Sequence, residues 1–217
     1  MANRRQVRPE ILDSLPADHP DARHSRRDLR LVNRIMGNHR WILRILPGVL
    51  RPGERVLELG AGDGELGCRL AGMGLAVDGL DTAPRPGNWP KGRLWHTADL
   101  RDFDGYHRYG AVVGNLIFHQ FDDPTLARLG RVLGGAVRVI VAREPSRSWL
   151  SRALFIGLAP LFGANRVTRH DGRVSIDAGF SADELPKALG LDPGNWALRC
   201  GKSQPGASFM IAVRRPQ

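Results

Sequence analysis

Three glycines, Gly60, Gly62 and Gly64, follow a predicted strand in the stretch "VLELGAGDGELG" and precede a predicted helix. Glycine lets the backbone turn sharply and lets a ligand come close to main-chain atoms. A second register, Gly62, Gly64 and Gly67, has the spacing of a dinucleotide-binding turn, although it begins late after the strand. The turn therefore predicts a ligand site without deciding between ligands.

Carboxylates stand in or at the end of the predicted strands around this turn. Glu58 lies inside the first strand, Asp81 ends the second in "VDGLD", and Asp99 ends the third in "HTADL". Asp81 is placed to accept both hydroxyls of a ribose. Asp99 is placed to accept from an adenine amine, while Leu100 offers a backbone N–H and an apolar edge. Asp81 alone fits either a dinucleotide fold or a methyl-donor fold.

Asn115 and His119 stand four residues apart in "GNLIFHQF", where the fourth apolar run ends. A histidine near its ordinary pKa can take a proton from a phenol or another hydroxyl, so His119 is a candidate base or acceptor-orienting group. If the strand turns into a helix here, both side chains face the same way. Packing of His119 against Phe118 and Phe121 is the competing interpretation.

His170 and Asp171, in "TRHDG", form a second candidate pair, and Glu144 ends the fifth apolar run. Ligands of open α/β sheets bind along the carboxyl edge of the strands, which is where Glu144 is expected. The alternatives are structural. "TRHDG" also reads as a turn, and Glu144 as an anchor paired with Arg147.

Short apolar runs that alternate with helical segments position these residues. The runs span 55–60, 75–81, 93–100, 110–118 and 136–144, with helices predicted over Glu65–Met73 and Asp123–Leu133. Such alternation predicts a parallel sheet with helices on both faces. An amphipathic helix, or two broken near Gly37, is expected over 26–46. After Glu144 come an apolar helical segment, a short helix starting near Ser181, and two strands over 196–200 and 208–215.

Composition indicates one soluble domain over residues 1–217, with 42% hydrophobic and 25% charged residues. No transmembrane span or signal core is predicted, and two cysteines favour a reducing, cytoplasmic setting. The net charge of +10 raises the possibility of a nucleic-acid partner. However, the basic residues are scattered and only Lys91, Lys187 and Lys202 are lysines, which weakens that interpretation. No cluster has metal-ligand spacing, so no metal is predicted.

With these features together, the sequence resembles the class I S-adenosylmethionine-dependent methyltransferases from roughly Arg26 to Arg215. The resemblance implies a Rossmann-like α/β fold with a seven-stranded, mostly parallel sheet, helices on both faces and an antiparallel last strand. It implies S-adenosylmethionine as cofactor and S-adenosylhomocysteine as product. The donor site would comprise Glu58, Gly60, Ala61, Gly62, Gly64, Asp81, Thr82, Asp99 and Leu100, with Asn115 and Leu116 beside the methionine portion.

A narrower resemblance links "NLIFHQFDD", "REPSRS" and "NRVTRHDGRVSIDAGF" to small bacterial methyltransferases encoded beside type III polyketide synthases. Gln120 departs from that group, in which a second histidine is frequent. Within the single domain, residues 1–50 are expected to form a helical cap, 54–145 the donor-binding core, and 146–217 a lid helix and the C-terminal strands. Asn33, Asn38, His39 and Trp41 of the cap could close the other side of the acceptor pocket.

The expected reaction is O- or C-methylation of a small aromatic or polyketide-derived acceptor, with His119 and His170 as the candidate catalytic residues. Methyltransferases that act on planar amines resemble one another in an Asn/Asp-Pro-Pro-aromatic motif, whereas Asn115 is followed by Leu-Ile-Phe. This argues against a nucleic-acid substrate. An RNA methyltransferase and an NAD(P)-dependent oxidoreductase remain the alternatives, and the oligomeric state is left open.

Overall fold

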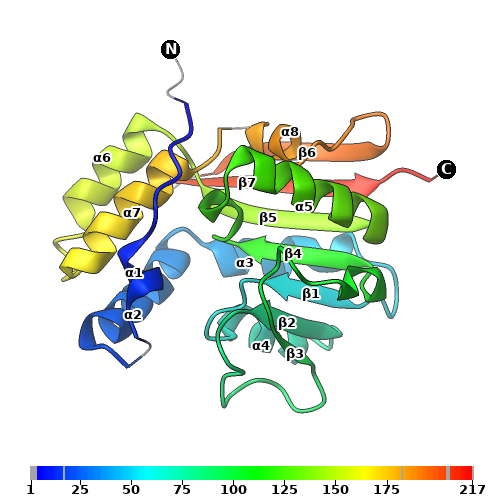
Figure 1. Ribbon diagram of the computed structural model, residues 1–217, viewed down its shortest axis with the longest axis horizontal. Helices are drawn as coiled ribbons and strands as arrows, with labels where there is room; N and C mark the ends of the chain where they lie inside the picture. The colour runs from blue at the N-terminus through cyan, green and yellow to red at the C-terminus, as the bar shows by residue number, and fades with distance from the viewer. Residues whose placement is uncertain (1–3, 17, 182, 204–205, 217) are drawn as a thin grey trace.

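The computed structural model describes residues 4–16, 18–181, 183–203 and 206–216. Within them one seven-stranded sheet runs in the order β3-β2-β1-β4-β5-β7-β6 (Figure 1). The strands are β1 Val56–Leu59, β2 Val77–Asp81, β3 Trp95–Thr97, β4 Ala111–Asn115, β5 Val139–Pro145, β6 Trp196–Ser203 and β7 Ala207–Arg214. The predicted strands are confirmed, although β3 is shorter than its apolar run.

The first five strands are parallel, and β7 lies antiparallel between β5 and β6. The register pairs Val139 of β5 with Val213, and Pro145 with Ala207. All seven residues of β5 are buried, as expected of a central strand that is covered on both faces. The predicted antiparallel insertion of the last strand is therefore confirmed.

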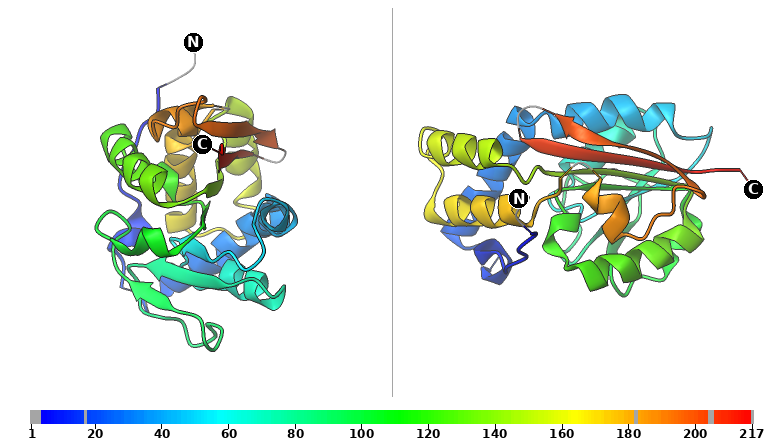
Figure 2. Two further views of the ribbon diagram at one scale, coloured as in Figure 1. Left: turned by 90° about the vertical axis from the view of Figure 1, so that its right-hand side faces the viewer. Right: turned by 90° about the horizontal axis from the view of Figure 1, so that it is seen from above.

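Helices cover both faces of the sheet (Figure 2). One layer contains α3 Asn38–Ile45 and α4 Glu65–Gly72, and the other contains α5 Asp123–Ala136 and α8 Glu184–Ala188. Each layer buries its own apolar cluster against the sheet. The first includes Ile42, Leu46, Leu66 and Leu70, and the second includes Leu126, Leu129, Leu133, Leu185 and Leu189.

Four further helices gather beyond the carboxyl ends of β4 and β5: α1 Ile11–Ser14, α2 Pro20–Ile35, α6 Trp149–Leu158 and α7 Arg166–Ala178 (Figure 1). Of the two alternatives for the N-terminal helical region, two helices broken near Gly37 is the confirmed one, because Gly37 separates α2 from α3 with a φ of 62°. Single-turn 3-10 helices connect other elements: η1 Leu46–Gly48, η2 Gly105–Arg108 and η3 Phe118–Gln120.

The interpretation of "TRHDG" as a turn is wrong, because this stretch lies inside α7. Asn165 caps that helix by accepting a hydrogen bond from the Thr168 N–H at 2.8 Å, which starts the helix before the motif. Among the described residues, none of the helices combines the length and the apolar content that crossing a bilayer requires.

Candidate active site

The glycine turn after β1 has the backbone geometry that only glycine adopts readily. Gly60, Gly62 and Gly64 have φ values of 62°, 55° and 74°. The Gly60 N–H donates to the Leu80 carbonyl oxygen at 2.9 Å, which ties the turn to β2. A Cβ on Gly60 would stand 2.6 Å from Cδ1 of Ile117, so a larger residue would clash as well as strain the backbone.

Asp81 holds this turn from the end of β2. One carboxylate oxygen accepts from the Gly62 N–H at 2.7 Å and the other from the Ala83 N–H at 2.8 Å. The side chain remains half-exposed, with the exposed Thr82 beside it. An ionised carboxylate has about four acceptor positions, so Asp81 can still accept from the hydroxyls of a ligand.

Asp99 and Leu100 lie at the neighbouring strand end, but Asp99 already has a partner. Its two carboxylate oxygens accept from the Arg101 Nε–H at 2.9 and 3.0 Å. These hydrogen bonds lower the pKa of Asp99, against a smaller opposing effect of burial. The Leu100 side chain is almost buried, and its carbonyl oxygen accepts from the Tyr106 hydroxyl at 2.6 Å. The sequence did not reveal the contact with Arg101.

Glu58 is buried inside β1 beneath the turn. Its Oε2 has no hydrogen-bond partner among the described residues. A Cβ on Gly67 would stand 2.6 Å from this oxygen, so the carboxyl group reaches into space that only glycine leaves. Burial raises the pKa of Glu58 well above its ordinary value, in spite of a hydrogen bond from the Gly67 backbone.

Asn115 and Leu116 mark the end of β4. The Asn115 amide donates to Oδ1 of Asn33 at 3.0 Å and lies 3.4 Å from Nε2 of His39. Its own Oδ1 is buried without a partner among the described residues. Leu116 has a φ of 59° and is the one non-glycine residue in the described ranges with a positive φ. Such strain persists only where the surroundings enforce it, and it clusters at functional sites.

Arg143, a residue that the sequence reasoning missed, supports this region from β5. It is 1% exposed and donates to Asn38 Oδ1 at 3.2 Å, to the Met36 carbonyl oxygen at 3.1 Å and to Ser203 Oγ at 2.7 Å. Burial lowers its pKa to about 10. Its guanidinium also lies 5.0 Å from the ring centre of Trp41. The sequence signal that could have identified Arg143 is its charge inside the apolar run 136–144.

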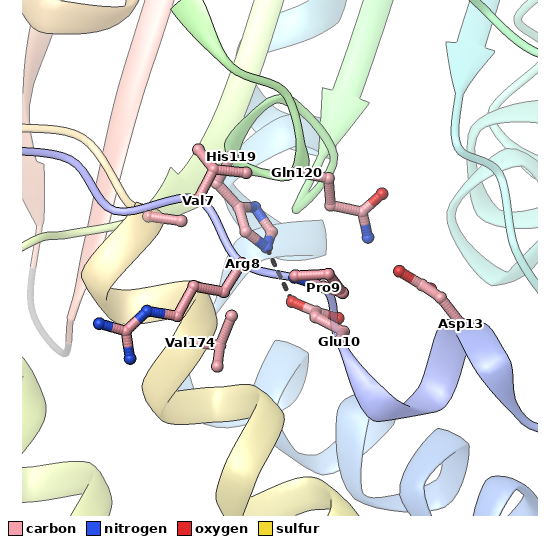
Figure 3. Close-up of a pocket in the computed structure, with 9 residues that line it drawn as sticks. Val7, Arg8, Pro9, Glu10, Asp13, His119, Gln120 and Val174 are labelled. Carbon is pink, nitrogen blue, oxygen red and sulfur yellow. Dashed lines mark ion pairs between the residues drawn. The ribbon is translucent and has the colours of Figure 1, made fainter.

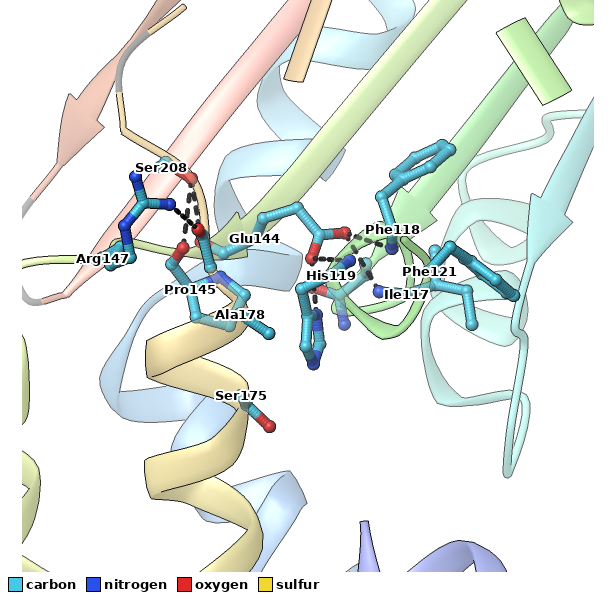
Figure 4. Close-up of polar contacts among 12 residues, drawn as sticks. Ile117, Phe118, His119, Phe121, Glu144, Pro145, Arg147, Ser175, Ala178 and Ser208 are labelled. Atoms are coloured by element: carbon cyan, nitrogen blue, oxygen red, sulfur yellow. Dashed lines mark hydrogen bonds and ion pairs between the residues drawn. The ribbon is translucent and has the colours of Figure 1, made fainter. Parts of the chain in front are cut away.

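Glu144 organises the loop that follows β4 (Figure 4). Its carboxylate accepts from the backbone N–H groups of Ile117, Phe118 and His119 at 3.0, 2.9 and 3.2 Å. It also bonds Nδ1 of His119 at 2.7 Å. The expected pairing of Glu144 with Arg147 is wrong, because Arg147 pairs instead with Glu184, at 2.6 Å.

His119 is 3% exposed and lies between two carboxylates. Besides Glu144 at Nδ1, it has Oε1 of Glu10 at 3.5 Å from Nε2. Burial alone would lower the pKa of His119, but the hydrogen bonds and charges of Glu10 and Glu144 outweigh it and raise the pKa to about 9. The side chain is therefore an imidazolium at neutral pH. Among the described residues it shares no partner with Asn115, whose amide contacts Asn33 of α2 and His39 of α3.

A cavity of about 210 Å³ adjoins His119, lined by the N-terminal segment, η3 and α7 (Figure 3). Its polar groups come from Arg8, Glu10, Asp13, His119 and Gln120. The pKa of Asp13 is raised to about 6, mainly by burial and then by the negative charges of Glu10 and Asp171. Neither Glu10 nor Asp13 was foreseen, because both lie in a short polar stretch with no periodicity.

Asp171 fixes the N-terminal segment over this cavity. Its two carboxylate oxygens accept from the Ile11 and Leu12 N–H groups at 2.8 and 2.9 Å, which caps α1. His170 bonds Asp171 through Nδ1 at 2.9 Å but lines a second cavity rather than the first. The structure thus places His119 on the wall of the first cavity and His170 on the wall of the second. Among the described residues, Asp171 lines neither cavity and holds the N-terminal segment through the Ile11 and Leu12 N–H groups.

Comparison with known proteins gave matches only at the level of structure. A scan against protein-family models and a search of the curated proteins found no match. The plantazolicin methyltransferase BpumL in complex with SAH superposes with a TM-score of 0.68 at 13% identity, covering 92% of each chain. Magnesium protoporphyrin IX methyltransferase (ChlM) from Synechocystis PCC 6803 with bound SAH gives 0.57 at 15% identity, covering 85% of this chain and 87% of that one.

The chain has the fold of the class I methyltransferases. A third structure, which concerns conversion of a disulfide bond into a thioacetal group during echinomycin biosynthesis, has a TM-score of 0.58 at 20% identity and covers 82% of this chain and 81% of that one. Identities this low establish the fold alone. The antiparallel β7 agrees with this fold and departs from the strand order of the dinucleotide-binding fold.

Proposed function

We propose that the chain transfers a methyl group from S-adenosylmethionine to a small acceptor. The observation that carries the proposal is the glycine turn after β1, held by the Asp81 carboxylate at the carboxyl edge of a β3-β2-β1-β4-β5-β7-β6 sheet. Ligands of open α/β sheets bind at this edge. The same edge carries Asp99 after β3 and Asn115 at the end of β4.

The residues at this edge suit the chemistry of that donor. Gly60 and Gly62 leave the turn without side chains, and Asp81 retains acceptor capacity for ribose hydroxyls. Asp99 would accept from an amine beside Leu100 by exchanging contacts that Arg101 now makes. The unpartnered oxygens of Glu58 and Asn115 are suited to accept from the donor's amino acid portion. The donor supplies an activated methyl group, and the protein's tasks are to align the partners and to exclude water.

The cavity beside His119 is the proposed acceptor site. Its volume of about 210 Å³ suits a small molecule, and Val7, Pro9, Val174 and Ala178 give it apolar walls. This supports a small aromatic or polyketide-derived acceptor, methylated on oxygen or carbon. The segment that covers the cavity is N-terminal, whereas α6 contributes no residue to it.

Proton removal, where the acceptor is a hydroxyl, is assigned to Asp13 with His119 as a positioning residue. Asp13 lines the cavity and its carboxylate points into it (Figure 3), with a pKa of about 6 that leaves it ionised at neutral pH. His119 is already protonated, and its side chain holds Glu10 and Glu144, the latter being the carboxylate that organises the loop after β4. His170 stays a proposed residue of the acceptor side, where it lines the second cavity beside α7.

Calorimetric titration of the full chain with S-adenosylhomocysteine and with NADH tests the proposal. We expect saturable binding of the first and none of the second. Asp81→Asn keeps the shape but removes the charge, so it should weaken S-adenosylhomocysteine binding by about tenfold or more, the scale for hydrogen bonds to a charged group. The control is Asp102→Asn at an exposed site outside the turn. NADH binding without S-adenosylhomocysteine binding would overturn the proposal.

A further inference from the structure

A second cavity, of about 470 Å³, lies between α6, α7 and the N-terminal segment. Its lining is basic: Arg8, Arg152, Arg166, Arg169 and Arg173. Among the described residues that line it, Asp177 is the one acid, and it pairs with Arg152. The hollow therefore carries a local excess of four positive charges.

Three of these arginines are free to bind something else. Within the described ranges, Arg166, Arg169 and Arg173 have no side-chain hydrogen bond or ion pair. They are exposed and stand three and four residues apart on α7, so they project from one face of the helix. Like charges on one helix face repel one another, so an anionic ligand would relieve a repulsion that the fold maintains.

The basic cavity shares a wall with the proposed acceptor cavity. Arg8 and Val174 line both, and the N-terminal segment, held by Asp171, covers both. A molecule in the first cavity can therefore extend past Val174 toward the arginines. The two cavities differ in charge, since Glu10 and Asp13 balance Arg8 and His119 in the first, whereas Asp177 alone faces five arginines in the second.

We propose that the basic cavity binds a phosphate or diphosphate group carried by the acceptor molecule, whose other end occupies the cavity beside His119. The second half of this proposal rests on the proposed methyl transfer. Arginine forks match phosphate oxygens in paired hydrogen bonds, and several unpaired guanidinium groups suit a group with more than one negative charge. A single hollow holds one such group, whereas a nucleic acid requires a basic track along its backbone.

Titration of the full chain with inorganic pyrophosphate tests the anion site without any methyl transfer. We expect saturable binding that weakens by about tenfold or more in Arg169→Gln and further in the Arg169→Gln, Arg173→Gln double variant. Arg131→Gln is the matched control, because Arg131 is equally exposed, lies on α5 and lines neither cavity. Equal weakening in the Arg131 variant, or no pyrophosphate binding by the native chain, would overturn the site.

An aryl phosphate tests whether one molecule reaches both cavities. Gln120 is an exposed residue of the first cavity, so Gln120→Trp narrows that cavity and leaves Arg166, Arg169 and Arg173, which line only the second cavity, unchanged. We expect Gln120→Trp to weaken 1-naphthyl phosphate and leave pyrophosphate unchanged, while Arg169→Gln weakens both. Insensitivity of 1-naphthyl phosphate to Gln120→Trp would refute the shared occupancy.

S-adenosylhomocysteine binding, measured on the same samples, separates the two proposals. Arg169→Gln should leave it unchanged, because Arg169 is not part of the glycine turn. If the native chain binds pyrophosphate but no S-adenosylhomocysteine, the methyl-transfer proposal fails and the anion site stands. A single-stranded RNA that binds through Arg169 and Arg173 more tightly than either phosphate probe, with a steep salt dependence, would replace the small-molecule ligand.

Discussion

The ion pairs of His119 predict how the stability of the protein depends on pH. His119 has an ordinary pKa of 6.5, and Glu10 and Glu144 raise it to about 9 in the folded chain. The folded state therefore holds a proton that the unfolded state has lost between these two values. The stabilisation is present in full below pH 6.5 and is lost as the pH rises through about 9. At 1.36 kcal/mol per pKa unit this is about 3 kcal/mol.

His119→Gln is the perturbation that isolates this contribution. Glutamine cannot carry the charge, so Glu10 and Glu144 lose their common cation and the folded state is destabilised at low pH. The difference in unfolding free energy between the native chain and the variant should therefore shrink by about 3 kcal/mol between pH 6 and pH 10. Taking this difference cancels the titration of groups far from the substitution.

Urea unfolding followed by tryptophan fluorescence provides the assay, since the chain has five tryptophans. His107→Gln is the control, because His107 is exposed and its Nδ1 contacts only the nearby Asp104 carbonyl oxygen among the described residues. That variant should stay within about 0.5 kcal/mol of the native chain at every pH. A difference for His119→Gln that does not change with pH would show that His119 is not held as an imidazolium.

Two further variants test the first cavity and the N-terminal segment that covers it. Asp13→Asn should lower turnover of a hydroxyl acceptor by roughly a hundredfold, with S-adenosylhomocysteine affinity unchanged. The variant should also lose the fall in rate that the native chain shows as the pH drops through about 6. If that fall persists in the variant, another group accepts the proton. Asp171→Asn removes the charge that caps the Ile11 and Leu12 N–H groups, so limited proteolysis should cut the N-terminal segment faster, while equal cutting in both proteins would contradict the capping role.

The elements of the sheet were predictable because their signals are local. Each strand of the parallel half is a short buried apolar run, and glycine or proline marks the turns between runs. The break at Gly37 was equally visible in the sequence. No local sequence pattern predicts the antiparallel position of β7, which was expected only because the motifs resemble those of a known fold.

The proposed donor side of the site was also within reach of sequence reasoning, since the turn glycines and Asp81 stand at the ends of two consecutive predicted strands. The acceptor side was not. The pKa of His119 depends on Glu10, 109 positions earlier, and Asp171 caps α1 across 160 positions. Such pairs arise from the packing of the N-terminal segment on α7. A polar stretch without periodicity carries no sign of that packing.

The distribution of charge across the proposed site would give the proposed acceptor a preferred orientation. Asp63 and Asp81 add to the burial that raises the pKa of Glu58, and the charge of Asp81 also contributes at Asp13, so the donor side is acidic. The wall of α7 beyond Val174 is basic, with its arginines unpaired within the described ranges. An acceptor with an anionic end is repelled from the first region and attracted to the second. If the acceptor bound in the reverse orientation, its anionic end would lie against carboxylates. Repulsion between like charges would disfavour that orientation. The charged groups would then select the orientation, and the apolar walls between them would set the length of the molecule that fits.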